Sequence, residues 1–405
     1  MRDDSRTGAE RQAEWPTRDT LVETIRGAVH GMIEQVVEQE LEATLGLGRY
    51  ERGEGRAGYR HGHVARILTT PLGPTRLRVP RGRLRTAAGR TVEWASHSLR
   101  RYARRMVAVD AAVLGCYFGG VNTRRVKTAL RPLLHDAPLS KSAISRLVGT
   151  VKGLFDAWRT RDLRGERIAY LYLDAIHLPM RVAGRVSRLP VLVAMGVRVT
   201  GHKVLLALQA AGSESEAAWR GMLEDLVARG LSVPRLVIID GSKGLRAAVA
   251  ATWPAAPVQR CTVHKLCNLL GAAPRHAHDE VRADFHAVVY AESLGAAQTA
   301  YARMRAKWTR LAPAVAASLA EGGEELLTFF QFPRAQWKSL RTTNGLERLN
   351  LEFRRRVKTQ AALPTSDAAL VVLFGLVASG QVRLRRIDGW ADLDHVVSQP
   401  AEAAA

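Results

Sequence analysis

Residues 235–264 read RLVIIDGSKGLRAAVAATWPAAPVQRCTVH and predict the kind of fold around them. RLVIID is expected to be a buried strand ending in the acid Asp240. A helix is expected over 245–252, and Val258 begins another short strand. A strand, a helix and a second strand in this order form a crossover unit, which places both strands parallel in one sheet.

The chain before this unit predicts three more strands. Residues 168–174 read IAYLYLD, which we expect to form a buried strand ending at its acid. The apolar runs 189–199 and 204–210 flank the turn residues Thr200-Gly201-His202. An amphipathic helix is expected over 214–229. The order of three strands, helix, strand, helix and strand predicts an antiparallel meander joined to parallel strands, and therefore a mixed sheet.

The N-terminal part of the chain has a different character. Apolar spacings of three and four predict a helix over 21–45, and residues 67–79 predict an Arg-rich β-hairpin around Pro71-Leu72-Gly73-Pro74. Further helices are expected over 106–117 and in the pair VNTRRVKTALRPLL and LSKSAISRLVGTVKGLF. This pair has the size of a helix-turn-helix, but a plain helical hairpin that connects domains explains it equally well.

The C-terminal part predicts helices without strands. Residues 266–331 are rich in Ala, Arg and Glu and lack strand signals, and 341–358 forms a strongly basic helix. We therefore expect a multidomain α+β chain with seven segments. These are an N-terminal helical segment (1–50), a basic β-rich segment (51–100), a helical helix-turn-helix-like region (101–165), the first part of an α/β core (166–265), a helical insertion (266–335), the last helices of the core (336–385) and a tail (386–405).

The charge of the chain is concentrated in one region. The 405 residues are 47% hydrophobic, enough for a sizeable core, and carry a formal charge of +22. Residues 52–131 contribute +15 of this charge, with 18 arginines and lysines against Glu54, Glu93 and Asp110. A solvated face normally mixes both signs, so this asymmetry favours a polyanion partner, most commonly nucleic acid. It argues against an enzyme of small neutral metabolites.

The remaining composition predicts the compartment. Three cysteines cannot form a disulfide framework in a chain of this length and fit a reducing environment. The N-terminus is polar and has no apolar signal region, and the most apolar stretch, 368–380, is shorter than the ~20 residues that a bilayer requires. We therefore expect a cytoplasmic protein that does not contact a membrane.

Two acids stand where predicted strands end. Asp174 and Asp240 each follow four or five apolar residues, and an ionised carboxylate there is costly unless it is paired. Each could cap the following turn, which is the commoner use of a single such residue. Two acids on neighbouring strands would instead repel each other unless a cation lay between them, and Mg²⁺ suits carboxylate oxygens. The pair therefore favours a metal site at the sheet edge.

A third acid is expected from the basic helix. Leu346, Leu349 and Phe353 form its core stripe, and Glu347 borders this stripe, where its carboxylate could reach over the sheet edge. Glu352 is a rival on the more solvated side. Three carboxylates that hold two Mg²⁺ ions about 4 Å apart are a known arrangement for phosphodiester chemistry, without a covalent nucleophile.

These residues stand in blocks that resemble the bacterial Mutator-type insertion-sequence transposases. The resemblance covers roughly residues 21–382. Its most specific parts are YLYLDAIHLPMR, the block LVIIDGSKGLRAAVAATWPAAPVQRCTVHKLCNLL, and WKSLRTTNGLERLNLEFRRRVK. Gly345 departs from the family pattern, in which a small Ala is more usual. The tract between Arg83 and Arg100 matches the family poorly, so the resemblance predicts no fold there.

The resemblance implies a DDE transposase with a ribonuclease H-like catalytic domain, interrupted by the helical insertion and preceded by a DNA-binding region. Asp174, Asp240 and Glu347 would be the catalytic, metal-binding triad, with two Mg²⁺ ions that Mn²⁺ could replace. The partners would be double-stranded DNA, both transposon ends and target, and further copies of the chain, at least a dimer in the synaptic complex. A bacterial, nucleoid-associated protein in the cytoplasm is implied.

Other residues are candidates for supporting roles. Those expected to support the acids are Arg260, Cys261, His264, Arg341 and Asn344. Those expected to contact DNA are Arg76, Arg78, Arg81, Arg83, Arg124, Arg125, Lys141, Arg146, Arg348, Arg354 and Arg355.

The spacing of Cys261, His264 and Cys267 has two further interpretations. Cys-x-x-His-x-x-Cys is most of a zinc site, with Cys116 as a distant fourth ligand. The same spacing suits one helical face packed on a core, where buried cysteine is ordinary, and this is the favoured interpretation.

Two other functions stay open at this point. A catalytically inactive or repurposed copy would bind specific DNA without cutting it. A metal-dependent nuclease would use the same acids without strand transfer. Intact acid blocks argue against the first alternative, and the helical insertion with the large basic region argues against the second.

Overall fold

The computed structural model describes residues 18–46, 48, 51, 56–121, 125–131, 140–359 and 362–393. The chain forms two compact units. The N-terminal unit comprises residues 1–116 and 123–147, and the C-terminal unit comprises 117–122 and 148–405.

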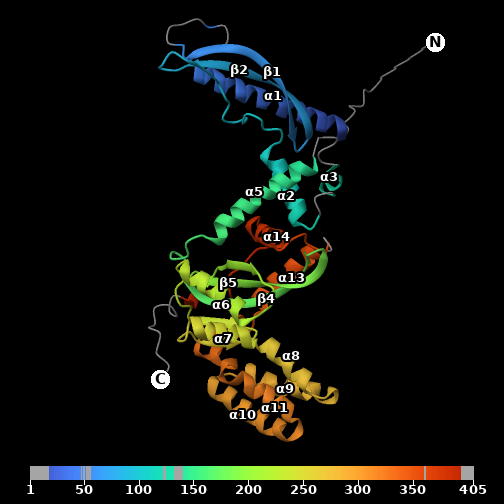
Figure 1. Ribbon diagram of the computed structural model, residues 1–405, viewed down its shortest axis with the longest axis vertical. Helices are drawn as coiled ribbons and strands as arrows, with labels where there is room; N and C mark the ends of the chain where they lie inside the picture. Colours follow the sequence, from blue (N-terminus) through green and yellow to red (C-terminus); the bar gives the residue numbers. More distant parts are fainter. Residues whose placement is uncertain are drawn as a thin grey trace, which may run out of the picture. The chain divides into compact units, whose positions relative to one another are not determined.

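A long helix packed on a small sheet forms most of the N-terminal unit (Figure 1). Helix α1 (Arg18–Leu45) covers the antiparallel sheet of β1 (Gly58–Thr70), β2 (Gly73–Arg85) and β3 (Thr91–Glu93). Side chains on β2 alternate, so that Leu77 is buried while its neighbours Arg76 and Arg78 are exposed. The predicted hairpin is confirmed, with longer strands than expected, because the register extends from the turn to Gly58.

Within the described residues up to 159, three helices follow this sheet. They are α2 (Val107–Phe118), α3 (Val126–Ala129) and α5 (Lys141–Arg159). The helices predicted at 106–117 and within LSKSAISRLVGTVKGLF are therefore confirmed. The link over 132–139 lies outside the described residues, so the helix-turn-helix interpretation stays a prediction.

A five-stranded mixed sheet forms the centre of the C-terminal unit. Its strands are β4 (Ile168–Val182), β5 (Arg185–Arg198), β6 (Lys203–Ala210), β7 (Leu236–Ile239) and β8 (Val258–Arg260), in the spatial order β6-β5-β4-β7-β8. The first three strands pair antiparallel, and β7 and β8 add parallel to β4. The predicted mixed sheet is thus confirmed.

Each face of this sheet is covered by helices. Helices α6 (Glu216–Ala228) and α7 (Lys243–Thr252) pack on one face, over a core that includes Leu171, Leu173 and Trp219. On the other face, alternate residues of β4 meet the C-terminal helices, where the Tyr172 hydroxyl donates to the Ser339 carbonyl (2.8 Å). Because side chains alternate along a strand, Asp174 lies on the same face as Tyr172.

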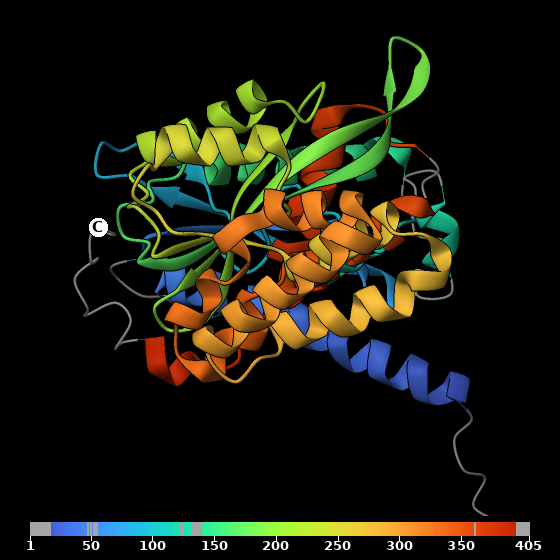
Figure 2. The same ribbon diagram turned by 90° about the horizontal axis from the view of Figure 1, so that it is seen from below.

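The expected end of β4 was wrong. Asp174 lies within this strand, which continues to Val182 because His177 and the residues after it pair with β5. The chain reverses at Ala183-Gly184, both with positive φ. The outer part of this hairpin extends beyond the rest of the sheet in Figure 2.

The segment after β8 is helical in its described residues, as predicted. It contains α8 (Thr262–Ala272), α9 (His278–Val289), α10 (Leu294–Leu311) and α11 (Pro313–Gly322), then α12 (Trp337–Leu340), α13 (Asn344–Lys358) and α14 (Ser366–Ala378). Short 3₁₀ turns occupy Arg275–Ala277, Gly323–Leu326, Thr328–Gln331, Arg334–Gln336 and Trp390–Asp392. Helices α8 to α11 lie beside one another in Figure 2.

An ionic cluster of two buried cations and one exposed acid fastens this helical segment to the sheet. Arg260, at the end of β8, donates to both carboxylate oxygens of Glu321 on α11, and Lys265 Nζ donates to the same carboxylate (2.5 Å). The arginine and lysine side chains are each 2% exposed. Among the described helices, none is both long and apolar enough to cross a membrane.

Candidate active site at the edge of the mixed sheet

Strand pairing brings two of the predicted acids together. Leu173 of β4 is opposite Ile239 of β7 in the parallel register, so the next residues, Asp174 and Asp240, lie side by side at this edge. Asp174 is 9% exposed, and its Oδ2 accepts a hydrogen bond from Asn350 Nδ2 (2.7 Å). The backbone N–H of Ser242 donates to Asp240 Oδ1 (2.9 Å).

Two carboxylates and one imidazole act on the charge of Asp174. Burial, followed by repulsion from Asp240 and to a lesser extent from Glu347, raises the pKa of Asp174 to about 6, although His264 acts in the opposite direction. Among the described residues, no lysine or arginine nitrogen forms an ion pair with Asp174 or Asp240. Adjacent carboxylates in this state are suited to binding a cation.

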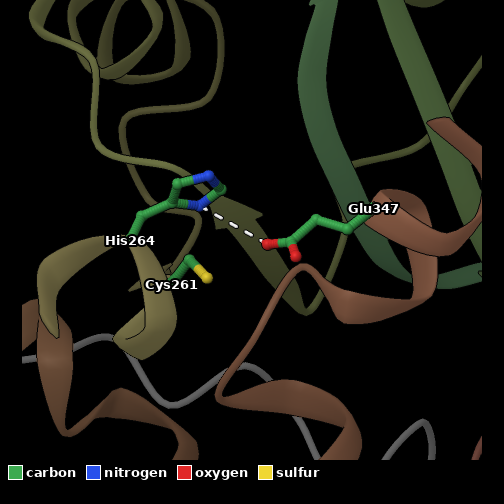
Figure 3. A group of neighbouring side chains, drawn as sticks. All are labelled: Cys261, His264 and Glu347. Atoms are coloured by element: carbon green, nitrogen blue, oxygen red, sulfur yellow. Dashed lines mark ion pairs between the residues drawn. The ribbon is translucent and has the colours of Figure 1, made fainter. Parts of the chain in front are cut away.

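Glu347 reaches the same region from the first turn of α13. Thr343 precedes this helix, is fully buried, and its hydroxyl donates to Glu347 Oε1 (2.9 Å). His264 of α8 approaches the same carboxylate, with 3.7 Å between Nδ1 and Oε1 (Figure 3). The third predicted acid therefore lies on α13 and faces α8. These two helices begin 82 residues apart in the sequence, at Asn344 and Thr262.

Cys261 completes this group beneath His264 (Figure 3). It is fully buried, and its Sγ accepts a hydrogen bond from the backbone N–H of Thr343 (3.3 Å). Burial raises the pKa of the Cys261 thiol, but hydrogen bonds from His264 and Thr343 outweigh burial and lower it overall. The hydrogen bond with Cys261, against the opposing effect of burial, raises the pKa of His264 to about 9, helped by the charges of Cys261, Asp174 and Glu347.

Two sets of donor atoms could hold a metal ion here. Asp174, Asp240 and Glu347 offer only oxygen, the donor that Mg²⁺ prefers, and the Oδ1 of Asn350 beside them is buried without a hydrogen-bond partner. Cys261 Sγ, His264 Nδ1 and a Glu347 oxygen all lie within 4.8 Å of one another, a mixed set more typical of zinc. Cys267 is exposed and belongs to no such group among the described residues, and Cys116 lies in the other unit.

The remaining support candidates contact other parts of the unit. Arg260 binds Glu321, and it also donates to the Gly241 carbonyl (3.1 Å) directly beneath Asp240. Arg341 lies over the Tyr290 ring, 4.0 Å from its centroid, and so contacts the helical segment. Asn344, at the start of α13, is exposed and lines a polar groove beside this helix.

The predicted DNA contacts fall on exposed surfaces of both units. Arg76, Arg78 and Arg83 are exposed on β2, whereas Arg81 is half-buried and pairs with Glu93 (2.8 Å). The exposed positions further along the chain are Arg125, Arg146, Arg348, Arg354 and Arg355. Arg124 and the side chain of Lys141 lie outside what the structure describes. The rival acid Glu352 pairs with Arg355 and Arg356.

Sequence reasoning missed three residues of this site. Asn350 is absent from the predicted set, although an amide one turn beyond Glu347 on the same helix was its signal. Thr343 was quoted only as part of its block. Glu214 follows β6, and burial together with the charge of Asp240 raises its pKa, which places a fourth acid beside the pair. No pattern in the sequence indicated Glu214.

Comparison with known proteins identifies the class of the chain. A family model described as "Transposase, Mutator family" matches residues 3–383. The transposase for insertion sequence element ISRM5 of Rhizobium meliloti is 33% identical over 91% of both chains. The transposase for insertion sequence element IS406 of Burkholderia multivorans is 34% identical over 87% of this chain and 89% of that protein.

The chain therefore belongs to the Mutator family of transposases. The resemblance seen in its acid-bearing blocks is confirmed. Among solved structures, the Drosophila P element transposase strand transfer complex matches 71% of this chain and 82% of that chain, with 10% identity and a TM-score of 0.29. That score is too low to support a comparison of folds.

Proposed function

We propose that this protein is a DNA transposase that cleaves the ends of an insertion sequence and joins them to target DNA. Asp174, Asp240 and Glu347 are its catalytic, metal-binding residues, and two Mg²⁺ ions, replaceable by Mn²⁺, are its cofactors. The mixed sheet with its helical insertion is then a ribonuclease H-like catalytic domain. The seven segments expected from the sequence remain our proposal for its organisation.

The observation that carries this proposal is the state of the Asp174–Asp240 pair. Two carboxylates stand side by side at the edge of β4 and β7 without an arginine or lysine ion pair among the described residues, and Asp174 has a pKa of about 6. Such a pair stores repulsion that a divalent cation would relieve. Family membership supports the assignment of that cation to DNA strand chemistry.

The chain itself contributes position and charge to the reaction. Asn350 fixes the orientation of Asp174, and Thr343 fixes that of Glu347 through the hydrogen bonds described above. Ions bound by these carboxylates would activate the attacking hydroxyl and stabilise the leaving oxygen. The exposed Arg354, one turn beyond Asn350, is placed to bind a neighbouring phosphate.

The reaction requires two steps at one site. Water first attacks a phosphodiester at the transposon end and releases a 3′-hydroxyl. This hydroxyl then attacks a phosphodiester of the target DNA, forming one bond and breaking one. Joining two ends calls for at least two copies of the chain in the synaptic complex.

Recognition of the ends is assigned to the N-terminal unit. Arg76 and Arg78 project from β2 on the side away from α1, where a duplex backbone could approach them. Contacts of this kind supply affinity that falls steeply with salt. Terminal inverted repeats would be recognised by this unit together with the helices over 101–165.

The test is Mg²⁺-dependent cleavage and strand transfer on labelled DNA that carries the element's own terminal repeats. Wild type is compared with Asp174→Asn, Asp240→Asn and Glu347→Gln, and with Glu224→Gln, an exposed acid on α6, as the control. We expect wild type and the control to nick and join, and the three variants to bind DNA without doing either.

Three outcomes would contradict the proposal or part of it. A wild type that binds the ends but never cuts, with Mg²⁺ or Mn²⁺, would be a repurposed DNA-binding protein. Cleavage without any joined product would indicate a nuclease. Full activity of one variant would show that its acid is wrongly assigned.

A further inference from the structure

A polar cavity lies in the C-terminal unit, beside α13. It has a volume of about 680 Å³, and one wall is α13 and the other is the segment after α14. Eight cations line it, and we call it the basic groove: Lys203, Lys338, Arg348, Arg355, Arg356, Arg383, Arg385 and Arg386.

The two acids that line the basic groove, Glu352 and Asp388, are already paired with three of its eight cations. Glu352 binds Arg355 (2.8 Å) and approaches Arg356, while Asp388 pairs with Lys338 (3.3 Å). Within the described part of the chain, no ion pair reaches Lys203, Arg348, Arg383 or Arg385. The groove therefore concentrates positive charge that the protein does not neutralise.

The closest cations in the groove repel each other. Lys203, at the start of β6, lies against the first turn of α13, where a side chain at Gly345 would come within 3.1 Å of its Nζ. Burial, together with the charge of Arg348, lowers the pKa of Lys203, although the charge of Asp388 acts in the opposite direction. The missing side chain at position 345 thus lets a half-buried ammonium group approach a helix that already carries an arginine, an arrangement that an anion would stabilise.

The wall formed by residues 381–388 is anchored rather than loose. Val382 and Ile387 are buried, and the N–H of Ile387 donates to the Gly201 carbonyl in the β5–β6 turn (3.1 Å). Arg383 and Arg385 lie between these two anchors and are exposed. The groove is therefore a preformed surface.

The basic groove and the three acids lie on different sides of α13. Glu347 faces the start of α8, next to Cys261 and His264. Gly345 faces Lys203 and Met195, on the β6 and β5 side of the sheet. A phosphodiester in the groove is consequently separate from one that reacts at the acids.

We propose that the basic groove binds the backbone of duplex DNA at a site separate from the phosphodiester being cut. This inference rests on the proposed function, because it assumes that the same unit acts on DNA. An extended row of unpaired cations in an anchored wall suits a polymer of phosphates better than one small anion.

The test replaces the two exposed arginines of the anchored wall, Arg383→Gln with Arg385→Gln, in the full chain. The matched control, Arg303→Gln with Arg310→Gln, removes the same charge from exposed positions on α10. Fluorescence anisotropy with a random-sequence duplex measures affinity against salt concentration. Two lost phosphate contacts are expected to lower the slope of log affinity against log salt by about two, and the control to leave it unchanged.

Activity assays then identify the DNA that occupies the groove. If it holds target DNA, the wall variant keeps cleavage of a short end duplex within about twofold, but joining of a pre-cut end to a plasmid falls at least about tenfold. If it holds end or flanking DNA, cleavage of a long end duplex falls as well. An unchanged salt slope would overturn the inference. Because binding is measured without catalysis, a wild type that fails to cleave would contradict the proposed function and leave this test intact.

Discussion

Asp174 combines burial with an acidic neighbour, and this has a cost in stability. Its pKa of about 6 in the folded state exceeds the ordinary 3.8, so the native state binds more protons than the unfolded state between these values. The favourable contribution of its protonated form is complete below about pH 4. It is lost as the pH rises through about 6.

We therefore expect Asp174→Asn to stabilise the protein at pH 8 in the absence of divalent ions, by roughly 2 kcal/mol, while abolishing activity. Mg²⁺ should raise the melting temperature of wild type and change that of the variant less. Thermal unfolding with EDTA and with Mg²⁺ at pH 5 and pH 8 checks this. The stability that the variant gains over wild type should be smaller at pH 5 than at pH 8. A destabilised variant at pH 8 would refute the account of the site.

Thr343 acts through Glu347 and is therefore a positioning residue. Thr343→Val keeps the shape of a fully buried side chain but removes the hydroxyl that donates to Glu347. We expect kcat for strand cleavage to fall at least about tenfold, because a misplaced Glu347 carboxylate slows the reaction. KM for DNA should be nearly unchanged, because Thr343 does not contribute to DNA binding. Thr343→Ser should restore most of kcat. Thr342→Val, on the neighbouring buried threonine, is the control, and an equal loss there would indicate a merely structural effect.

The turn between β7 and α7 depends on Gly241. Its φ of +92° is unfavourable for other residues, and an added Cβ would lie 2.2 Å from the Arg260 guanidinium. Gly241→Ala should lower the free energy of unfolding by at least about 2 kcal/mol and displace Asp240. In Gly271→Ala, where nothing lies within 4 Å, stability should be unchanged or slightly higher. Denaturant unfolding of both variants measures these free energies of unfolding. Equal stability of the two variants would contradict the prediction.

The helical insertion is fastened to the sheet by Glu321. Although burial opposes it, hydrogen bonds from Arg260 and Lys265 lower the pKa of Glu321 to about 2. The stabilisation is complete above about pH 4.5 and is lost as the pH falls towards 2. Glu321→Gln leaves two buried cations poorly paired, but Glu321 itself is 44% exposed and solvent screens its charge, so the expected cost at pH 7 is only about 2 kcal/mol. Glu325→Gln, which breaks the exposed pair with Arg246, should cost less than about 1 kcal/mol. Equal losses in thermal unfolding would contradict this role.

At the scale of the whole molecule, the two units should respond separately. Arg76→Gln with Arg78→Gln removes two exposed charges from the N-terminal unit. We expect weaker binding to end DNA and a salt slope reduced by about two, but an unchanged shift of the melting temperature with Mg²⁺. Binding titrations and thermal unfolding on the same preparations check both parts. A lost Mg²⁺ response would show that the arginines affect the catalytic unit.

The fold of the C-terminal unit was largely predictable because its strands are continuous apolar runs that are bounded by turn residues or acids. The order of strands and helices then limited the sheet to a mixed one. The end of β4 was not predictable from local pattern, because polar residues after Asp174 form a strand only by pairing with β5. The sequence of one segment does not show whether a partner strand will extend its pairing, because strand formation depends on the neighbouring strand.

The sequence by itself determined which acids, which basic helix and which family this chain has, because these depend on residue identity and spacing. Only the tertiary structure decided what surrounds them. Asn350, Glu214 and Lys203 meet their partners across gaps of 26 to 176 residues, and no periodicity encodes such contacts. The burial of a group and the electrostatic field of its neighbours are properties of the packed molecule. The raised pKa of Asp174 and the unpaired charge of the basic groove therefore appear only after folding.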